Sequence, residues 1–92
     1  MNPKRKGNRQ EHRSKAILEA AGYAVTRAAG SLGAWDLVGI SATDVVLVQC
    51  KSNRAPSPAE REALKLFPCP ANCKRLVHVW FDRQRWPRVT EL

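Results

Sequence analysis

Residues 35–51 read WDLVGISATDVVLVQCK, and this stretch decides the fold. Two short runs rich in β-branched residues lie on either side of the polar segment SATD, a pattern that is typical of two strands joined by a tight turn. Because the connector is so short, the strands should run antiparallel, with Ala42 and Thr43 at the tip of the turn. The sequence therefore predicts a β-hairpin whose turn fixes which residues face each other.

The polar residues of this hairpin gather at its open end. The opposed pairs are Ile40 with Val45, Val38 with Leu47, and Asp36 with Gln49. Opposed residues have Cβ atoms roughly 4.5–5.5 Å apart, and alternation along the strand puts Lys51 on the same face as Gln49. A carboxylate, an amide oxygen and an ammonium group should therefore converge at one end of a buried hairpin. The alternative is a capped hairpin end with a surface ion pair between Asp36 and Lys51.

The composition is that of one small, basic domain. The 92 residues suffice for a single core. The 16 Lys and Arg residues against 8 Asp and Glu give a net charge of +8, which favours a polyanionic partner, nucleic acid before membrane. No apolar run approaches the roughly 18 residues of a membrane span, and the N-terminus lacks the apolar region of a signal peptide. We expect a cytoplasmic protein with no membrane partner.

Local start and stop signals predict the remaining elements. Ser57, Pro58 and Glu60 supply an N-cap, a first-turn proline and a capping box, so a helix should begin there and end near Phe67. We further predict a helix over residues 9–21, strands over 23–29 and 76–81, and an edge strand over 86–92. Residues 1–8 read as a basic arm that orders on a phosphate backbone, or as a solvated tail.

The three cysteines, an odd number, favour a reducing compartment. Cys50 should point into the core, and Cys69 and Cys73 are expected to be free thiols in a loop. An alternative makes these two residues and His78 zinc ligands, but the C-x3-C spacing is unusual and structural zinc normally takes four ligands. We expect His78 to be a packed strand histidine rather than a catalytic base.

An ordered set of residues in the first half of the chain resembles the PD-(D/E)xK nuclease superfamily, and within it the archaeal-type Holliday junction resolvases. The matching positions are Lys6, Gly7, Glu11, residues 22–25, Arg27, residues 29–31, residues 36–38 and residues 49–51. The resemblance implies a restriction-endonuclease-like α/β fold, in which a central mixed β-sheet is flanked by helices with an αβββαβ core. It also implies a single nuclease domain, residues 1–92, that cleaves four-way DNA junctions as a metal-dependent homodimer.

The resemblance assigns roles to individual side chains. Glu11 would reach the site from the first helix, Asp36 would ligate Mg²⁺ or Mn²⁺, Lys51 would position the attacking water, and Arg27 and Ser31 would contact the phosphate near the scissile bond. We further expect Gln49, through its amide oxygen, and Glu11 to be metal ligands. The residues expected to contact DNA are Lys4, Arg5, Lys6, Arg9, Arg13, Arg27, Ser31, Lys51 and Arg54. Alternatively, Glu11 only complements the dipole of the first helix, and Arg27 only extends to solvent.

The chemistry of these residue types supports the same site. Mg²⁺ prefers hard oxygen ligands and keeps several waters, so one carboxylate, an amide oxygen, a backbone carbonyl and the substrate can suffice. Two positions depart from the family. Gln49 stands where glutamate is usual, which removes one negative charge, and His12 stands where the resolvases often carry arginine.

Two other functions fit the same residues. One is a nuclease of this fold that acts on flaps, nicks or modified duplex. The other is a basic nucleic-acid-binding module with an inactive site, an interpretation that Gln49 favours. For the homodimer, the candidate interface residues are Leu64, Phe67, Trp80 and Trp86.

Overall fold

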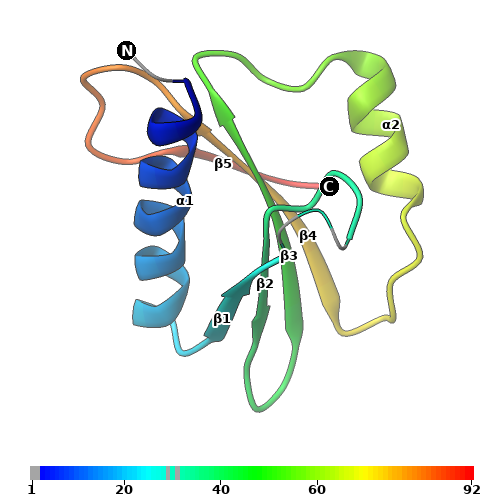
Figure 1. Ribbon diagram of the computed structural model, residues 1–92. Coiled ribbons are helices and arrows are strands. Elements are labelled where there is room, and N and C mark those ends of the chain that lie inside the picture. Colours follow the sequence, from blue (N-terminus) through cyan, green and yellow to red (C-terminus); the bar gives the residue numbers. More distant parts are fainter. Residues whose placement is uncertain (1–2, 29, 31) are drawn as a thin grey trace.

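A five-stranded sheet forms the centre of the fold, and one helix packs on each of its faces (Figure 1). The computed structural model describes residues 3–28, 30 and 32–92, with side chains from residue 9 onward. The elements are α1 (Pro3–Ala20), β1 (Ala24–Arg27), β2 (Leu37–Ile40), β3 (Val45–Ser52), α2 (Pro58–Leu66), β4 (Cys73–Trp80) and β5 (Arg88–Glu91). The strands follow one another across the sheet, and all neighbours are antiparallel except β3 and β4, which are parallel and connected through α2. The predicted α/β fold with a central mixed sheet is confirmed.

The helices cover opposite faces of the sheet. The core on the α1 side contains Leu18, Leu37, Val46 and Val48. The core on the α2 side contains Trp35, Leu47, Leu64, Val77 and Val79. Because successive strand residues point to opposite faces, Gln49 and Lys51 lie in phase with Leu47 and project on the α2 side.

The β2–β3 hairpin has the predicted register. The observed pairs are Leu37 with Val48, Val38 with Leu47, Gly39 with Val46, and Ile40 with Val45. The predicted pair of Asp36 with Gln49 is not among them, because the Asp36 amide bonds to Val48 O and its carboxylate accepts from the Cys50 amide. A hydrogen bond of 2.9 Å from Ser41 N to Asp44 O closes the two-residue turn. β2 begins at Leu37 rather than at the predicted Trp35, because the Trp35 amide bonds to Leu32 in the preceding turn. Gly39 is required at its position, since a Cβ there would lie 2.8 Å from Val46 Cγ1.

The first helix starts earlier than predicted, at Pro3 instead of Arg9. Residues 3–8, which we predicted to be a basic arm, are therefore helical, and residues 1 and 2 lie outside the described part of the chain. The end of α1 is close to the prediction. Gly22 adopts φ +102°, the left-handed region that favours glycine. This turns the chain out of the helix, after the last helical residue at position 20.

The other strand boundaries differ where the local pattern is weak. β1 is shorter than the predicted 23–29, and β4 begins at residue 73 instead of 76. The first three residues of β4 show no apolar alternation, and they form strand because they pair in parallel with residues 45–47 of β3. β5 spans residues 88–91 at the edge of the sheet, as expected for a segment that follows Pro87.

The second helix begins as predicted, but the predicted dimer surface is wrong in part. Ser57 is the N-cap and forms a capping box with Glu60, and the helix ends at residue 66. Leu64 and Trp80 are buried in the core, with 2% and 1% of their surface exposed. Phe67 packs edge-on against Trp35, with ring centroids 6.0 Å apart. Burial removes Leu64 and Trp80 from the candidate interface.

The cysteine prediction needs correction. Cys69 and Cys73 form a disulfide, where free thiols were expected, because the turn between them brings the two Cα atoms to 5.9 Å. Their sulfurs are therefore bonded to each other rather than arranged as zinc ligands. Cys50 is a free thiol, and burial raises its pKa to about 12. His78 is the packed strand histidine that we predicted, 1% exposed, with Nδ1 2.8 Å from Ser14 Oγ.

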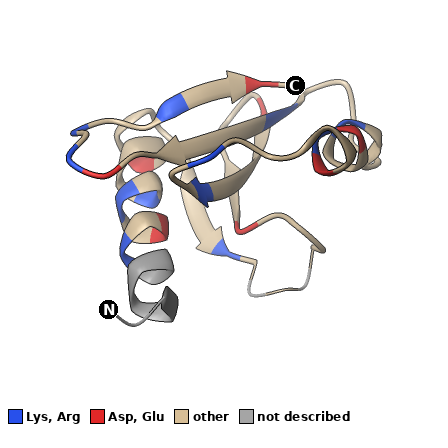
Figure 2. Ribbon diagram, turned by 90° about the horizontal axis from the view of Figure 1, so that it is seen from above, with Lys and Arg blue, Asp and Glu red and all other residues tan. Residues whose placement is uncertain are grey.

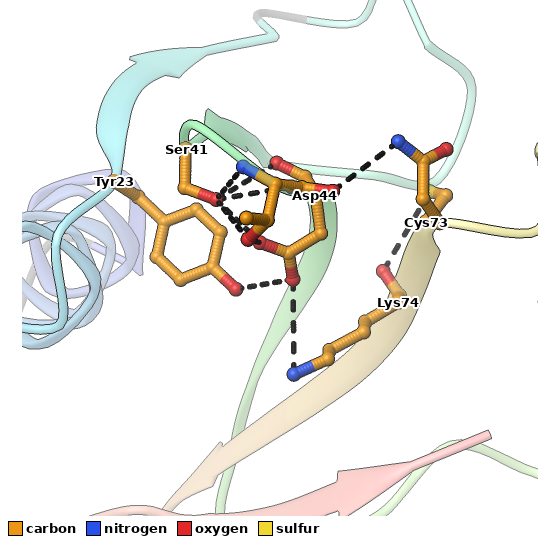
Figure 3. A network of polar contacts seen from close by, with 7 residues as sticks. Tyr23, Ser41, Asp44, Cys73 and Lys74 are labelled. Atoms are coloured by element: carbon orange, nitrogen blue, oxygen red, sulfur yellow. Dashed lines mark hydrogen bonds and ion pairs between the residues drawn. The ribbon is translucent and has the colours of Figure 1, made fainter.

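A polar network closes the end of the sheet that carries the β2–β3 turn. Tyr23 donates a hydrogen bond of 2.6 Å to Asp44, and Lys74 lies 3.7 Å from the same carboxylate oxygen (Figure 3). Ser41 also donates to Asp44, and the Ser41 and Tyr23 bonds lower the pKa of this carboxyl. The network ties the start of β1 and the start of β4 to the hairpin turn. It leaves the opposite end of the sheet for the candidate site.

Charged residues are spread over both helices and several loops (Figure 2). Among the described residues, neither helix has the length and apolar character that crossing a membrane requires.

Candidate active site

The predicted site residues meet where β1 ends, β2 begins and β3 ends. Arg27 is the last residue of β1, Asp36 directly precedes β2, and Gln49 and Lys51 lie near the end of β3. Antiparallel pairing of β2 with both neighbours brings these three segments to the same end of the sheet. Glu11 reaches the site from α1, on the other face, where it contacts Arg27. The site therefore combines residues from both layers.

Asp36 is held by the hairpin itself. Its amide donates a hydrogen bond of 2.9 Å to Val48 O, the residue that pairs with Leu37. Its Oδ2 accepts a bond of 2.8 Å from the Cys50 amide. Burial raises the pKa of the Asp36 carboxyl above its ordinary value, and the Glu11 charge adds to this rise. The Cys50 amide, Arg27 and Lys51 act in the opposite direction, so charges from both layers reach Asp36.

Gln49 is buried and its side-chain oxygen lacks a partner. Only 7% of its surface is exposed. Among the described residues, Gln49 Oε1 is the one buried side-chain nitrogen or oxygen atom without a hydrogen bond. A buried acceptor that is left unpaired costs roughly 1–3 kcal/mol, so native proteins seldom keep one without a ligand or a role. This atom is therefore available to coordinate a cation.

Lys51 is paired with a residue that the sequence did not indicate for the site. Its Nζ lies 3.0 Å from Glu60 Oε2, at the start of α2. The other oxygen of Glu60 accepts the Ser57 amide at 3.1 Å, so one carboxylate both caps the helix and holds the lysine. The Lys51 ammonium, followed by the Ser57 amide and hydroxyl, lowers the pKa of Glu60 to about 2. The alternative ion pair between Lys51 and Asp36 is absent from the ion pairs of the described residues.

Glu11 and Arg27 form the second charge pair of the site. Arg27 Nε lies 2.8 Å from Glu11 Oε1. The Glu11 side chain is 17% exposed and that of Arg27 is 48% exposed. The carboxylate is thus sheltered between α1 and β1, while the guanidinium extends toward solvent. Because α1 begins at Pro3, Glu11 lies beyond its first turn, and the alternative role of complementing the helix dipole is wrong. Its contact with Arg27 brings Glu11 to the end of β1.

Buried polar contacts fix α1 against the end of the sheet. Gln10, which precedes Glu11, is 6% exposed and bonds through Oε1 to Ser52 at the end of β3. One turn later, Ser14 Oγ accepts a 2.8 Å bond from Trp80 Nε1. These contacts hold the helix in one rotation about its axis. Glu11 is therefore positioned by the helix frame as well as by Arg27.

The predicted DNA contacts have different surroundings. Arg9 and Arg54 are exposed. Arg13 anchors the β4–β5 loop, because its guanidinium lies 4.0 Å from the Trp80 ring centroid and donates to Arg85 O at 3.0 Å. The side chains of Lys4, Arg5 and Lys6, and all of Ser31, fall outside the described residues.

The donor set fits a hard divalent cation if the amide takes part. Within the part of the chain that the structure describes, no three His, Cys, Asp or Glu side chains group closely enough to hold a metal. The available protein oxygens are the carboxylates of Asp36 and Glu11 and the orphaned Oε1 of Gln49. An oxygen-only set suits Mg²⁺, which completes its shell with waters and substrate oxygens.

Comparison with known proteins agrees with this geometry. The family model of archaeal Holliday junction resolvases (Hjc) matches residues 2–84. The solved structure of Archaeoglobus fulgidus Hjc, a Holliday junction resolvase from an archaeal hyperthermophile, has a TM-score of 0.73 and 26% sequence identity, and the match covers 94% of this chain and 72% of that chain. No curated protein sequence matches. Since the family match spans most of the chain, the chain belongs to the archaeal Holliday junction resolvase family and is an endodeoxyribonuclease with the restriction-endonuclease-like fold.

Proposed function

We propose that the protein resolves four-way DNA junctions with Mg²⁺, or Mn²⁺ in its place, held by Asp36, Gln49 and Glu11. The observation that carries the proposal is the buried, unpartnered Oε1 of Gln49, at the same end of the sheet as the Asp36 carboxyl, whose pKa is raised by burial. A buried oxygen atom that has neither water nor a protein donor as a partner destabilises the fold unless a ligand binds it. A divalent cation would recover this loss for the Gln49 amide oxygen, and the Asp36 and Glu11 carboxylates would supply the negative charge that it needs.

The protein groups around this position have separable tasks. Asp36 keeps Oδ2 on the Cys50 amide, which fixes the carboxylate and orients Oδ1. Glu11 supplies the second negative charge, which Arg27 balances. When bound, the cation would neutralise charge on the non-bridging phosphate oxygens and favour deprotonation of a water. Because Gln49 is neutral, the site holds its cation with less negative charge than a site with glutamate.

Lys51 is the proposed group at the attacking water and the scissile phosphate. Its ammonium is a point charge on a flexible stem, so its position depends on what holds it. Glu60 holds it at 3.0 Å and is itself fixed by the capping box of α2. We therefore assign Glu60 as a positioning residue. Arg27 and Ser31 remain the proposed contacts to the phosphate.

The working unit in this proposal is a two-fold homodimer. A four-way junction must be cut on two opposed strands, and two identical sites related by a closed C₂ axis match that geometry. One chain provides one candidate site. Sedimentation at micromolar concentration, combined with cleavage of a cruciform plasmid, tests this part. A dimer that makes paired cuts supports it, whereas a monomer that makes single nicks contradicts it.

Cleavage of labelled DNA tests the proposal as a whole. A four-way junction and a linear duplex of the same sequence are incubated with the protein, with and without Mg²⁺. We expect cleavage of the junction only, and only with the ion. Equal cutting of flaps, nicks or duplex would favour a general nuclease of this fold. Tight junction binding without any cleavage would favour the nucleic-acid-binding module.

A further inference from the structure

The β4–β5 loop, residues 81–87, leaves the sheet at the same end as the candidate site. Ser52 at the end of β3 pairs with Trp80 at the end of β4. Beyond this pair, the Asp82 amide donates to Asn53 Oδ1 at 2.9 Å, so the β3–α2 and β4–β5 loops lie against each other. Arg13, in the middle of α1, donates hydrogen bonds to Gln84 O and Arg85 O, so the β4–β5 loop also lies along this helix. The loop therefore borders the surface on which the DNA must lie.

The side chains of this loop are basic and aromatic. Arg83 and Arg85 are exposed, and no acidic residue in the described part of the chain pairs with either guanidinium. Between them and Arg88 stands Trp86, with 67% of its surface exposed. The exposed indole ring, flanked by arginines, is accessible to a partner. Arginine side chains bind DNA phosphates, and a tryptophan ring stacks on the faces of bases.

Trp86 lines two neighbouring open pockets. One, of about 600 Å³, is lined by Phe81, Gln84, Trp86, Pro87 and Arg88. The other, of about 340 Å³, is lined by Arg13, Ala16, Ile17, Ala20, Trp80, Arg85 and Trp86. The indole therefore projects from the surface between the two pockets. Flat ligands can reach its ring.

The loop that carries Trp86 is held in place by α1. Arg13 stacks over Trp80 at 4.0 Å and donates to the carbonyl oxygens of Gln84 at 3.4 Å and Arg85 at 3.0 Å. Trp80 is fixed in turn by its bond to Ser14. A contact residue on a held loop loses little conformational entropy on binding. The loop therefore holds Trp86 in an exposed position before any ligand binds.

We propose that Trp86 stacks on a base pair exposed at the branch point of the junction, with Arg83 and Arg85 on the flanking phosphates, so that this loop distinguishes branched from linear DNA. The inference rests on the proposed function. In a continuous duplex every internal base pair is covered by its neighbours, whereas an opened branch point leaves base faces uncovered. Stacking on Trp86 would therefore favour the branched substrate. A second protein copy fits this surface poorly, because symmetric contact would bring two sets of arginines together.

Equilibrium binding without divalent metal tests the inference apart from cleavage. Affinities for a four-way junction and a linear duplex of the same sequence are compared for the wild type, Trp86→Ala and Trp86→Phe. We expect Trp86→Ala to weaken junction binding at least about fivefold, with less than about a twofold change for duplex, and Trp86→Phe to keep most of the preference. Arg83→Ala should weaken both DNAs alike and reduce the salt dependence by about one phosphate. Ile40→Ala, which removes another exposed apolar side chain at the far end of the sheet, serves as the control.

Three outcomes would contradict the inference. Equal loss on junction and duplex would make Trp86 a general DNA contact. No loss on either would remove it from the interface, and conversion of a dimer to monomer in sedimentation would make it a subunit contact. If the wild type binds junctions selectively through Trp86 but does not cleave them with Mg²⁺, the proposed metal-dependent cleavage fails while the loop assignment stands. A 2-aminopurine placed at the branch point reports stacking directly, because its fluorescence should change with the wild type and not with Trp86→Ala.

Discussion

Replacing Gln49 by methionine should stabilise the metal-free protein and abolish cleavage. The side chain is 7% exposed and its Oε1 has no hydrogen-bond partner. An unpaired buried acceptor costs roughly 1–3 kcal/mol, and methionine fills a similar volume without that acceptor. We therefore expect the free energy of unfolding of Gln49→Met to rise by about 1 kcal/mol, which corresponds to a melting temperature about 4–8 °C higher for a domain of this size. Cleavage should be lost, since a thioether does not ligate Mg²⁺.

The assay compares unfolding and cleavage in the same preparations. Urea unfolding is measured in chelator and again in excess Mg²⁺, and junction cleavage is measured under single-turnover conditions. Mg²⁺ should stabilise the wild type, because a ligand that binds only the folded state shifts the equilibrium toward it, and the stabilisation should be absent in Gln49→Met. Gln49→Glu should cleave at least as well as the wild type at lower Mg²⁺ concentrations.

Gln10→Met is the matched control. Gln10 is also buried, at 6% exposure, but its Oε1 is bonded to Ser52. Removing a satisfied amide should destabilise the protein by about 0.5–1.5 kcal/mol, the opposite sign from Gln49→Met. A Gln49→Met protein that is less stable than the wild type, or that still cleaves junctions, would refute the assignment of Gln49 as an unpaired cation ligand.

Four further predictions concern the other site residues. Asp36→Asn and Lys51→Ala should abolish cleavage while junction affinity, measured by electrophoretic shift, changes by less than about tenfold; equal loss of binding and cleavage would contradict a catalytic role. Glu11→Gln should slow single-turnover cleavage by at least about tenfold, and an unchanged rate would leave Glu11 as a structural partner of Arg27 only. Glu60→Gln keeps the capping box but removes the carboxylate charge that faces the Lys51 ammonium, so it should slow cleavage with little change in melting temperature. It should have no further effect in the Lys51→Ala background. Burial lowers the pKa of His78 from 6.5 to about 4, so the unfolded state binds the proton first as pH falls. The free energy of unfolding should therefore fall by up to about 3 kcal/mol as the pH is lowered from 6.5 to 4. Urea unfolding should find this pH dependence reduced in His78→Leu.

Local signals in the sequence were sufficient for the hairpin and for the start of α2. A two-residue turn fixes its register by geometry, and the Ser57 capping box involves residues three apart, so neither needs knowledge of the rest of the fold. The predicted pair of Asp36 with Gln49 did not form, because Asp36 bonds to Val48 and Cys50 on either side of Gln49. The family resemblance added Glu11 and Arg27 from elements whose packing the sequence alone does not specify.

What the sequence could not show depends on contacts distant along the chain. The pairing of Lys51 with Glu60 exists because α2 crosses from β3 to β4 over the face to which Lys51 points. The early start of α1 was missed because its first residues carry no capping or apolar pattern, and tertiary bonds such as that of Gln10 with Ser52 support the helix instead. The disulfide was missed because the prediction used the number of cysteines, which favoured a reducing compartment. That number carries no information about the turn that brings Cys69 close to Cys73.

The parallel pairing of β3 with β4 has a consequence for folding. Every proposed catalytic side chain lies within the first 60 residues, yet residues 45–52 pair along their whole length with residues 73–80. Antiparallel neighbours such as β2 and β3 can form early through a short loop, whereas this pair must wait for the α2 crossover to close. During synthesis, a nascent chain that already contains Glu11, Asp36 and Lys51 therefore lacks the strand that supports one side of β3. The nuclease centre should become ordered only after β4 has emerged from the ribosome.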